Sequence, residues 1–231
     1  MPTVDGGGPT GLPSPATGLS ATATILLLAN QQLQDTTGTK WGDDVLIPYL
    51  NLAILEIINI KPEAYPSQVD ITMVAGAKQS LAAGSIALID VLCNLDGSNN
   101  PTGVIRTVTK NVMDNLFPGW MYETASATPT LIVTDPNDPK TFYAYPSVSG
   151  ATSKIRAITS VPPTELDESD DTFPLDASYR QPVIDYIVYR ALAEETTIPN
   201  ALSKSKMFHD KFLQFFGIKN AVEKNAEAKS K

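Results

Sequence analysis

The order of periodic segments along this chain constrains its fold more than any other feature. Near both ends, apolar residues recur at helical spacing, whereas the middle carries short runs of β-branched and aromatic residues bounded by Gly, Pro, Asn and Asp. This order indicates an α+β protein in which an antiparallel β module is inserted into an α-helical bundle of four main helices. The helices are predicted at residues 20–36, 43–60, 178–195 and 200–216, and the β insertion at residues 69–161.

Residues suited to helix ends support these boundaries. Ser20 is a suitable N-cap for the first helix, and Gly217 is a suitable stop for the last. Pro48 is expected in the first turn of the second helix or at a kink in it. Because only residues 37–40 connect the first two helices, these helices are predicted to pack as antiparallel neighbours.

Residues 130–146 predict a hairpin at the centre of the β insertion. Strand-forming residues stand on both sides of two turn-forming steps, Asp135-Pro136 and Asp138-Pro139. The second strand is predicted to end at Pro146, which has no N–H to donate within a sheet. All the predicted strands are short and joined by turns. Since no long helical crossover stands between them, their pairing is predicted to be antiparallel throughout.

Two other segments of the insertion are less regular. Residues 109–116 fit a short helix with Val112, Met113 and Leu116 on one apolar face, ended by Pro118-Gly119. The Ala-rich residues 75–83 fit either a strand or a helical turn.

Composition excludes several functional classes. The net charge of −8 argues against a protein that grips nucleic acid by neutralising phosphates, although DNA could still pass alongside it. The single cysteine allows no internal disulfide, and no apolar run is long enough to span a membrane. With no signal segment either, the protein is expected to be soluble and not secreted by that route.

No arrangement of residues in the sequence announces catalysis. His209, the single histidine, stands in the last predicted helix, where a surface or packing role is the simpler interpretation. Cys93 lies in an apolar strand and is interpreted as a core residue. Gly6, Gly7 and Gly8 neither follow a strand nor open a helix, so they are not a phosphate loop. The sequence therefore predicts no catalytic, cofactor-binding or metal-binding residues, no cofactor, and no enzyme activity.

The two ends of the chain differ in composition from the rest. Residues 1–18 are rich in Gly and Pro and are predicted to form a flexible arm, or alternatively an arm along a neighbouring subunit. Residues 218–231 are rich in Lys, Glu and Ala and are predicted to form a C-terminal tail with little to bury. Between them, residues 19–217 are predicted to form one domain.

The succession of motifs resembles the bacteriophage head-to-tail adaptor, or connector, proteins of the tail tubular A-like kind. The resemblance covers about residues 25 to 217 and rests on the ordered series as a whole. The matching pieces are Leu33-Gln34-Asp35 with Gly38 and Trp41, Tyr49-Leu50-Asn51 with Ala53, Glu56 and Ile57, Gly76 with Gln79 and Leu81, Leu88-Ile89-Asp90-Val91 with Asn94, Phe117-Pro118-Gly119-Trp120, the hairpin from Asp135 to Pro146, and the stretch from Tyr186 to Ala191.

This resemblance implies a structural role in the virion. Copies of such proteins form a ring, typically a dodecamer, that docks beneath the portal protein and joins the capsid to the tail nozzle or other tail proteins. Genomic DNA passes through the channel without specific binding, and no membrane is involved. The protein would be made in the host cytoplasm and reside in the neck or tail of the virion.

Three sets of residues are candidates for contacts in such an assembly. The set proposed to dock on the portal lies in the C-terminal tail and comprises Ile218, Lys219, Val222, Lys224 and Lys229. The set proposed to contact the tail or another subunit is the hairpin turn of Asp135, Pro136, Asn137, Asp138, Pro139 and Lys140. The set proposed to face the channel, unless it is an outer loop, comprises Glu165, Asp167, Glu168, Asp170 and Asp171.

Two alternatives remain open from the sequence. One is an adaptor-like virion protein with peptidoglycan hydrolase activity, in which Glu and Asp residues would serve as acid and base. The other is a different neck component, such as a head-completion stopper or a tail-tube subunit.

Overall fold

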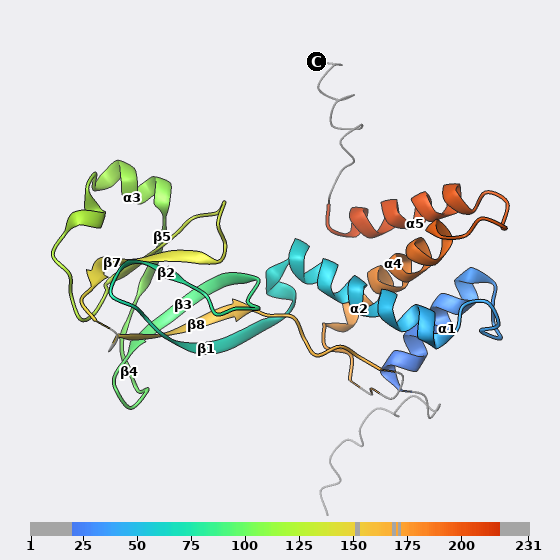
Figure 1. Ribbon diagram of the computed structural model, residues 1–231, viewed down its shortest axis with the longest axis horizontal. Helices are drawn as coiled ribbons and strands as arrows, with labels where there is room; N and C mark the ends of the chain where they lie inside the picture. Colours follow the sequence, from blue (N-terminus) through green and yellow to red (C-terminus); the bar gives the residue numbers. More distant parts are fainter. Residues whose placement is uncertain (1–19, 151–152, 168–169, 171, 218–231) are drawn as a thin grey trace, which may run out of the picture.

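Figure 1 shows the computed structural model of the chain, which describes residues 20–150, 153–167, 170 and 172–217. A helical part and a β part lie at opposite ends of the long axis of the molecule (Figure 1). Residues 61–65 lead from the helices into the strands, and the chain returns after residue 160. The described residues form five α-helices and two sheets, so the predicted α+β class is confirmed.

Four of the helices build the helical part: α1 (Ala21–Leu33), α2 (Asp43–Ile60), α4 (Arg180–Ala193) and α5 (Ala201–Phe215). Helix α4 packs against each of the other three, and its Val183, Ile187 and Val188 are fully buried in a core that all four helices share. Helices α1 and α2 touch each other only slightly. The pairing predicted from their short connection is therefore not the main contact of either helix, because the apolar stripes of both meet α4.

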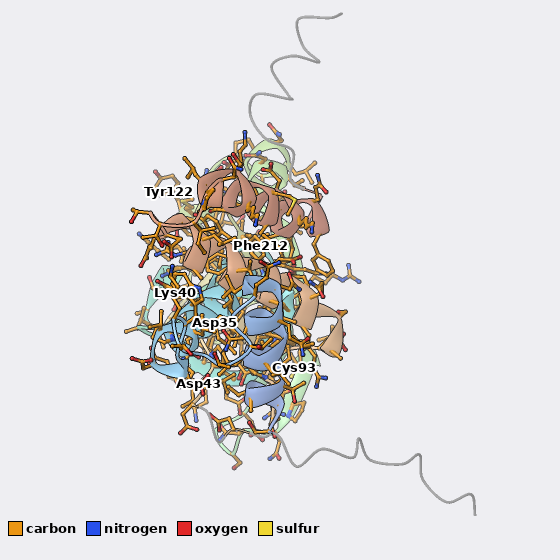
Figure 2. All side chains as sticks on the ribbon, turned by 90° about the vertical axis from the view of Figure 1, so that its right-hand side faces the viewer. Asp35, Lys40, Asp43, Cys93, Tyr122 and Phe212 are labelled. Atoms are coloured by element: carbon orange, nitrogen blue, oxygen red, sulfur yellow. The ribbon has the colours of Figure 1, made fainter. Side chains whose placement is uncertain are left out.

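Side chains in the connections tie the helices together. The Asp35 carboxylate accepts hydrogen bonds from the backbone N–H groups of Lys40 and Trp41, both at 2.8 Å. Lys40 in turn forms an ion pair with Glu195 and donates to Thr197 Oγ1 at 3.1 Å. The Lys40 ammonium, with help from Thr197, lowers the pKa of Glu195 to about 2. Figure 2, which looks onto the helical end, shows Asp35 and Lys40 in this connection.

The described residues of the β part form eight strands in two sheets. The strands are β1 (Pro66–Thr72), β2 (Gly76–Ser80), β3 (Ala87–Leu95), β4 (Pro101–Val104), β5 (Arg106–Thr109), β6 (Leu131–Thr134), β7 (Thr141–Val148) and β8 (Lys154–Ser160). The orders are β1-β8-β3-β4 in one sheet and β2-β7-β6-β5 in the other. Both sheets contribute to one core, which includes Val91 and Ile155 from the first and Ile132 and Phe142 from the second.

One pair of strands overturns the prediction of an entirely antiparallel module. Strands β5 and β6 are parallel, with Thr107 opposite Ile132 and Val108 opposite Val133. Parallel neighbours need a crossover of about a dozen residues or more, usually with a helix. The segment between β5 and β6 holds α3 (Lys110–Leu116) and the 3-10 turn η2 (Trp120–Tyr122), which suffice for that crossover. The short helix was visible in the sequence, but its role as a crossover was not.

The predicted hairpin is confirmed as the antiparallel pair β6 and β7, with Ile132 opposite Ala144. The prediction that Pro146 ends the second strand is wrong, since β7 continues to Val148. Toward β6, the last paired residue of β7 is Tyr145, just before Pro146. Toward β2, the paired residues of β7 on either side of Pro146 are Tyr143 and Val148, and the register shifts between them, so Pro146 has no paired residue there either. Pro146 therefore lies where its missing N–H interrupts no ladder bond.

Helix α3 covers the outer face of the second sheet. Met113 and Trp120 are buried there against Val133. Of the three residues predicted on one apolar face, only Met113 is buried, whereas Val112 and Leu116 are exposed. A helix of only seven residues resting on a sheet buries little more than one position per turn.

The structure predicts a large stability difference between two aromatic residues of the β part. Replacement of the fully buried Phe142 by Ala should lower the free energy of unfolding by about 3–5 kcal/mol, because it leaves a cavity between the sheets. The matched change Tyr122→Ala removes a side chain that is 92% exposed and should cost less than about 0.5 kcal/mol. Urea titrations followed by circular dichroism measure both values, and equal losses would contradict this placement of the core.

Candidate assembly surfaces

The candidate portal-docking residues of the C-terminal tail, from Ile218 to Lys229, lie outside the described residues. The structure does define where the tail begins. Gly217, with a φ of 68°, donates its N–H to the Gln214 carbonyl at 3.0 Å and ends α5 as the sequence predicted. The preceding Phe216 packs against Tyr179 and Phe212, with ring centroids 6.3 and 5.3 Å apart. The tail therefore starts from an aromatic cluster anchored in the helical core, in which Figure 2 marks Phe212.

The hairpin tip, defined as Asp135 to Lys140, has a fixed backbone. The carboxylate of Asp135 accepts the Asn137 N–H at 2.9 Å, as expected for an Asp that opens a turn. The carbonyl of Pro139 accepts from the N–H of Leu88 at 2.9 Å, and that of Lys140 accepts from Leu81 at 3.0 Å. Pro136 to Lys140 are nevertheless exposed. The tip thus offers exposed side chains on a backbone held by its neighbours.

The position of the hairpin tip follows from the strand register. Leu88, whose N–H binds the Pro139 carbonyl of the tip, follows Ala87 at the start of β3. Ala87 pairs with Ser160 at the end of β8, and Ser160 pairs on its other side with Pro66 at the start of β1. Those strand ends are the ones that connect to the helices. The hairpin tip therefore lies at the end of the β part that faces the helical part.

The described part of the acidic segment lies against the helical part. Glu165 and Asp167 are exposed, while Asp170 is half-buried. The Asp170 carbonyl accepts the N–H of Thr22 at 3.2 Å, so this residue lies at the start of α1. Two further members of the predicted set, Glu168 and Asp171, lie outside the described residues. The structure thus places the described acidic residues beside α1 and α2, on the returning connection.

Asn51 holds this connection, a role that the sequence did not reveal. Its amide nitrogen donates to the Leu166 carbonyl at 3.0 Å, and its amide oxygen accepts the Leu166 N–H at 2.9 Å. Residues 162–166 thereby lie along α2 and border a cavity of about 510 Å³ with Leu52 and Leu55. An Asn within the apolar sequence of a helix was the signal that could have indicated such a contact.

Two chemically reactive side chains of the helical part, Asp185 and His209, have hydrogen-bonding or packing contacts. Burial raises the pKa of Asp185, and the Gln181 amide donates to this carboxylate at 2.9 Å. The ring of His209 packs on Tyr189 at 4.5 Å between centroids. Among the residues that the structure describes, no group of three or more His, Cys, Asp or Glu side chains could hold a metal ion, and no helix is long and apolar enough to cross a membrane.

Loss of the Asn51 amide should release the returning connection. In Asn51→Leu, the Leu166 N–H loses its acceptor, so its hydrogen exchange should become about 5- to 150-fold faster, which corresponds to about 1–3 kcal/mol for a hydrogen bond left unmade. Exchange measured by mass spectrometry on peptides that cover residues 162–167 tests this expectation. Gln31→Leu, at an exposed position of α1, is the control and should leave exchange there unchanged.

Comparison with known proteins gives the family. The family model described as SU10 adaptor protein matches residues 20–227, a range that includes every helix and strand of the described fold. The search of curated proteins found no match. Since the matched range is far more than half of the 231 residues, the resemblance to phage adaptors is confirmed. The chain belongs to the SU10 adaptor protein family, which is a family of phage head-to-tail adaptors.

Proposed function

We propose that copies of this protein form a ring, a dodecamer, between the portal and the tail of a phage, and that genomic DNA passes through this ring. The observation that carries the proposal is the family match, which makes the chain a structural phage protein. The two-part architecture supports it, because a helical part and a β part with separate cores can each meet a different neighbour. The family match also favours a structural role for this protein over the alternative role as a peptidoglycan hydrolase.

Exposed apolar residues on the helical part support lateral contacts between copies. Leu27 and Leu28 on α1, and Leu52 and Leu55 on α2, are each more than one-third exposed. Apolar side chains that gather on a surface mark sites of association. In this proposal the four helices act as a bundle that packs side by side with its neighbours around the ring.

The C-terminal tail is the proposed portal-docking element. It follows the anchored aromatic cluster of Tyr179, Phe212 and Phe216, so its starting point is fixed relative to the helical core. The residues proposed to contact the portal are Ile218, Lys219, Val222, Lys224 and Lys229. Segments with little to bury alone can gain order by binding a partner, which is the physical basis for this assignment.

Removal of the tail tests this assignment. A chain that ends at Gly217 should retain the fold, because the described cores lie before that residue, yet it should lose binding to portal rings in a pull-down by at least tenfold. The full chain is the control. Particles from a phage that lacks the protein entirely should be DNA-filled heads without tails in negative-stain images. Tailed particles would contradict the adaptor role, whereas unchanged binding by the shortened chain would contradict only the role of the tail.

The remaining two surfaces have proposed positions in the ring. The acidic residues from Glu165 to Asp171 face the channel, where like charge discourages adhesion of DNA phosphates. The hairpin tip contacts a neighbouring copy or a tail protein. A reconstruction of the neck tests both positions: acidic residues on the ring exterior, or a hairpin tip surrounded by solvent, would contradict the respective proposal. Replacement of the hairpin tip by a Gly/Ser turn should also reduce the number of tailed particles.

A further inference from the structure

The segment from Val112 to Tyr122 presents a concentration of exposed apolar side chains. Leu116 is 67% exposed and Tyr122 is 92% exposed, while Val112, Phe117 and Met121 are each more than one-third exposed. These five residues are called the α3 patch below. Single exposed apolar residues are ordinary on protein surfaces, but several from one short segment are typical of an interaction site.

The α3 patch is not needed to complete the fold of its own chain. The face of this segment that packs on the second sheet is formed by Met113 and Trp120, both almost fully buried. Trp120 donates its indole N–H to Asp114 at 2.9 Å and meets the Tyr143 ring edge-on at 5.8 Å. Phe117 stacks on Tyr145 with ring centroids 6.5 Å apart. The patch is therefore carried on a fixed base, to which Phe117 itself is joined, and polar residues could replace its two most exposed members, Leu116 and Tyr122, with little loss of packing.

The topology of the β part defines two flanks. Strands β4 and β5 are separated only by Ile105 and are the edges of different sheets, so they form one flank together. Strands β1 and β2 are the opposite edges of the same two sheets and form the other flank. Among the residues that the structure describes, each edge strand pairs with one neighbouring strand and has no strand partner on its other side. Helix α3 follows β5 directly, so the α3 patch adjoins the β4–β5 flank.

The β1–β2 flank also exposes an apolar residue on a fixed backbone. Val74, in the turn between β1 and β2, is 59% exposed. The buried Gln79 holds this turn, because its amide oxygen accepts the Val74 N–H at 2.8 Å and its amide nitrogen donates to the carbonyls of Val74 at 2.8 Å and Gly76 at 3.0 Å. Both flanks are thus preorganised for contact.

We propose that the β4–β5 flank of one copy, with its α3 patch, docks on the β1–β2 flank of the next copy. This inference rests on the proposed ring. A ring is closed by unlike surfaces that meet head to tail, and this chain carries open strand edges on opposite flanks of one module. Strand edges complement one another through backbone N–H and C=O groups alone. The α3 patch supplies the apolar contact at the side of that pairing, and Val74 lies on the receiving flank.

Site-specific photo-crosslinking in phage particles tests the contact. With p-benzoylphenylalanine in place of Tyr122, irradiated particles should yield covalent dimers of this chain, with the crosslinked peptide drawn from residues 66–80. The same amino acid at Leu202, which is 76% exposed on α5, is the control and should not link to residues 66–80. Crosslinks from position 122 only to another virion protein, or no crosslinks, would overturn the proposal.

Charged substitutions give an independent measurement. The double variant Leu116→Lys with Tyr122→Lys should reduce the copies of the protein per particle at least tenfold, and Val74→Lys should cause a similar loss from the opposite flank. Because all three positions are exposed, the urea midpoints of the variants should match that of the unmodified chain. Normal incorporation of both variants would overturn the inference alone. Absence of the unmodified protein from particles would instead overturn the proposed function.

Discussion

The packing of α2 against α4 is the contact on which the rest of the structure depends. These helices share one core, although the whole β part stands between them in the sequence. Closing so long a loop costs conformational entropy, which the antiparallel pairing of β1 with β8 reduces. Because Pro66 at the start of β1 pairs with Ser160 at the end of β8, the chain leaves and re-enters the helical part at adjacent points. The β part is therefore an insertion whose own fold brings α2 and α4 together.

Within the β part, the two central strands of the second sheet, β6 and β7, are covered on both faces. Ile132 and Phe142 face the core between the sheets, whereas Val133 and Tyr143 face α3 and η2. This arrangement explains why β6 is a continuous apolar run rather than an alternating one. It also leaves the α3 segment with an inner side that is full and an outer side that is apolar, which is the basis for assigning that side to a neighbouring copy.

The surfaces proposed for assembly, and the returning connection, are held by backbone hydrogen bonds and side-chain amides. Gln79 holds the turn at Val74, Asn51 holds the returning connection at Leu166, and the carbonyls of Pro139 and Lys140 anchor the hairpin tip. A surface already fixed before contact loses less conformational entropy on binding than a mobile one. Fixed loops on a two-part body suit a protein whose role is to join other components.

The sequence by itself determined the positions of the four main helices, the hairpin, the cap at Ser20 and the stop at Gly217, because these depend on local periodicity and on the properties of single residues. It also led to the family through the order of its motifs. Only the tertiary structure decided that α4 is the common partner of the helices, that β5 and β6 are parallel, and that Pro146 lies inside a strand. The roles of Asn51 and Gln79 were likewise decided there. These features depend on which segments meet in space, and the period of a segment specifies which residues share a face but not what that face will meet.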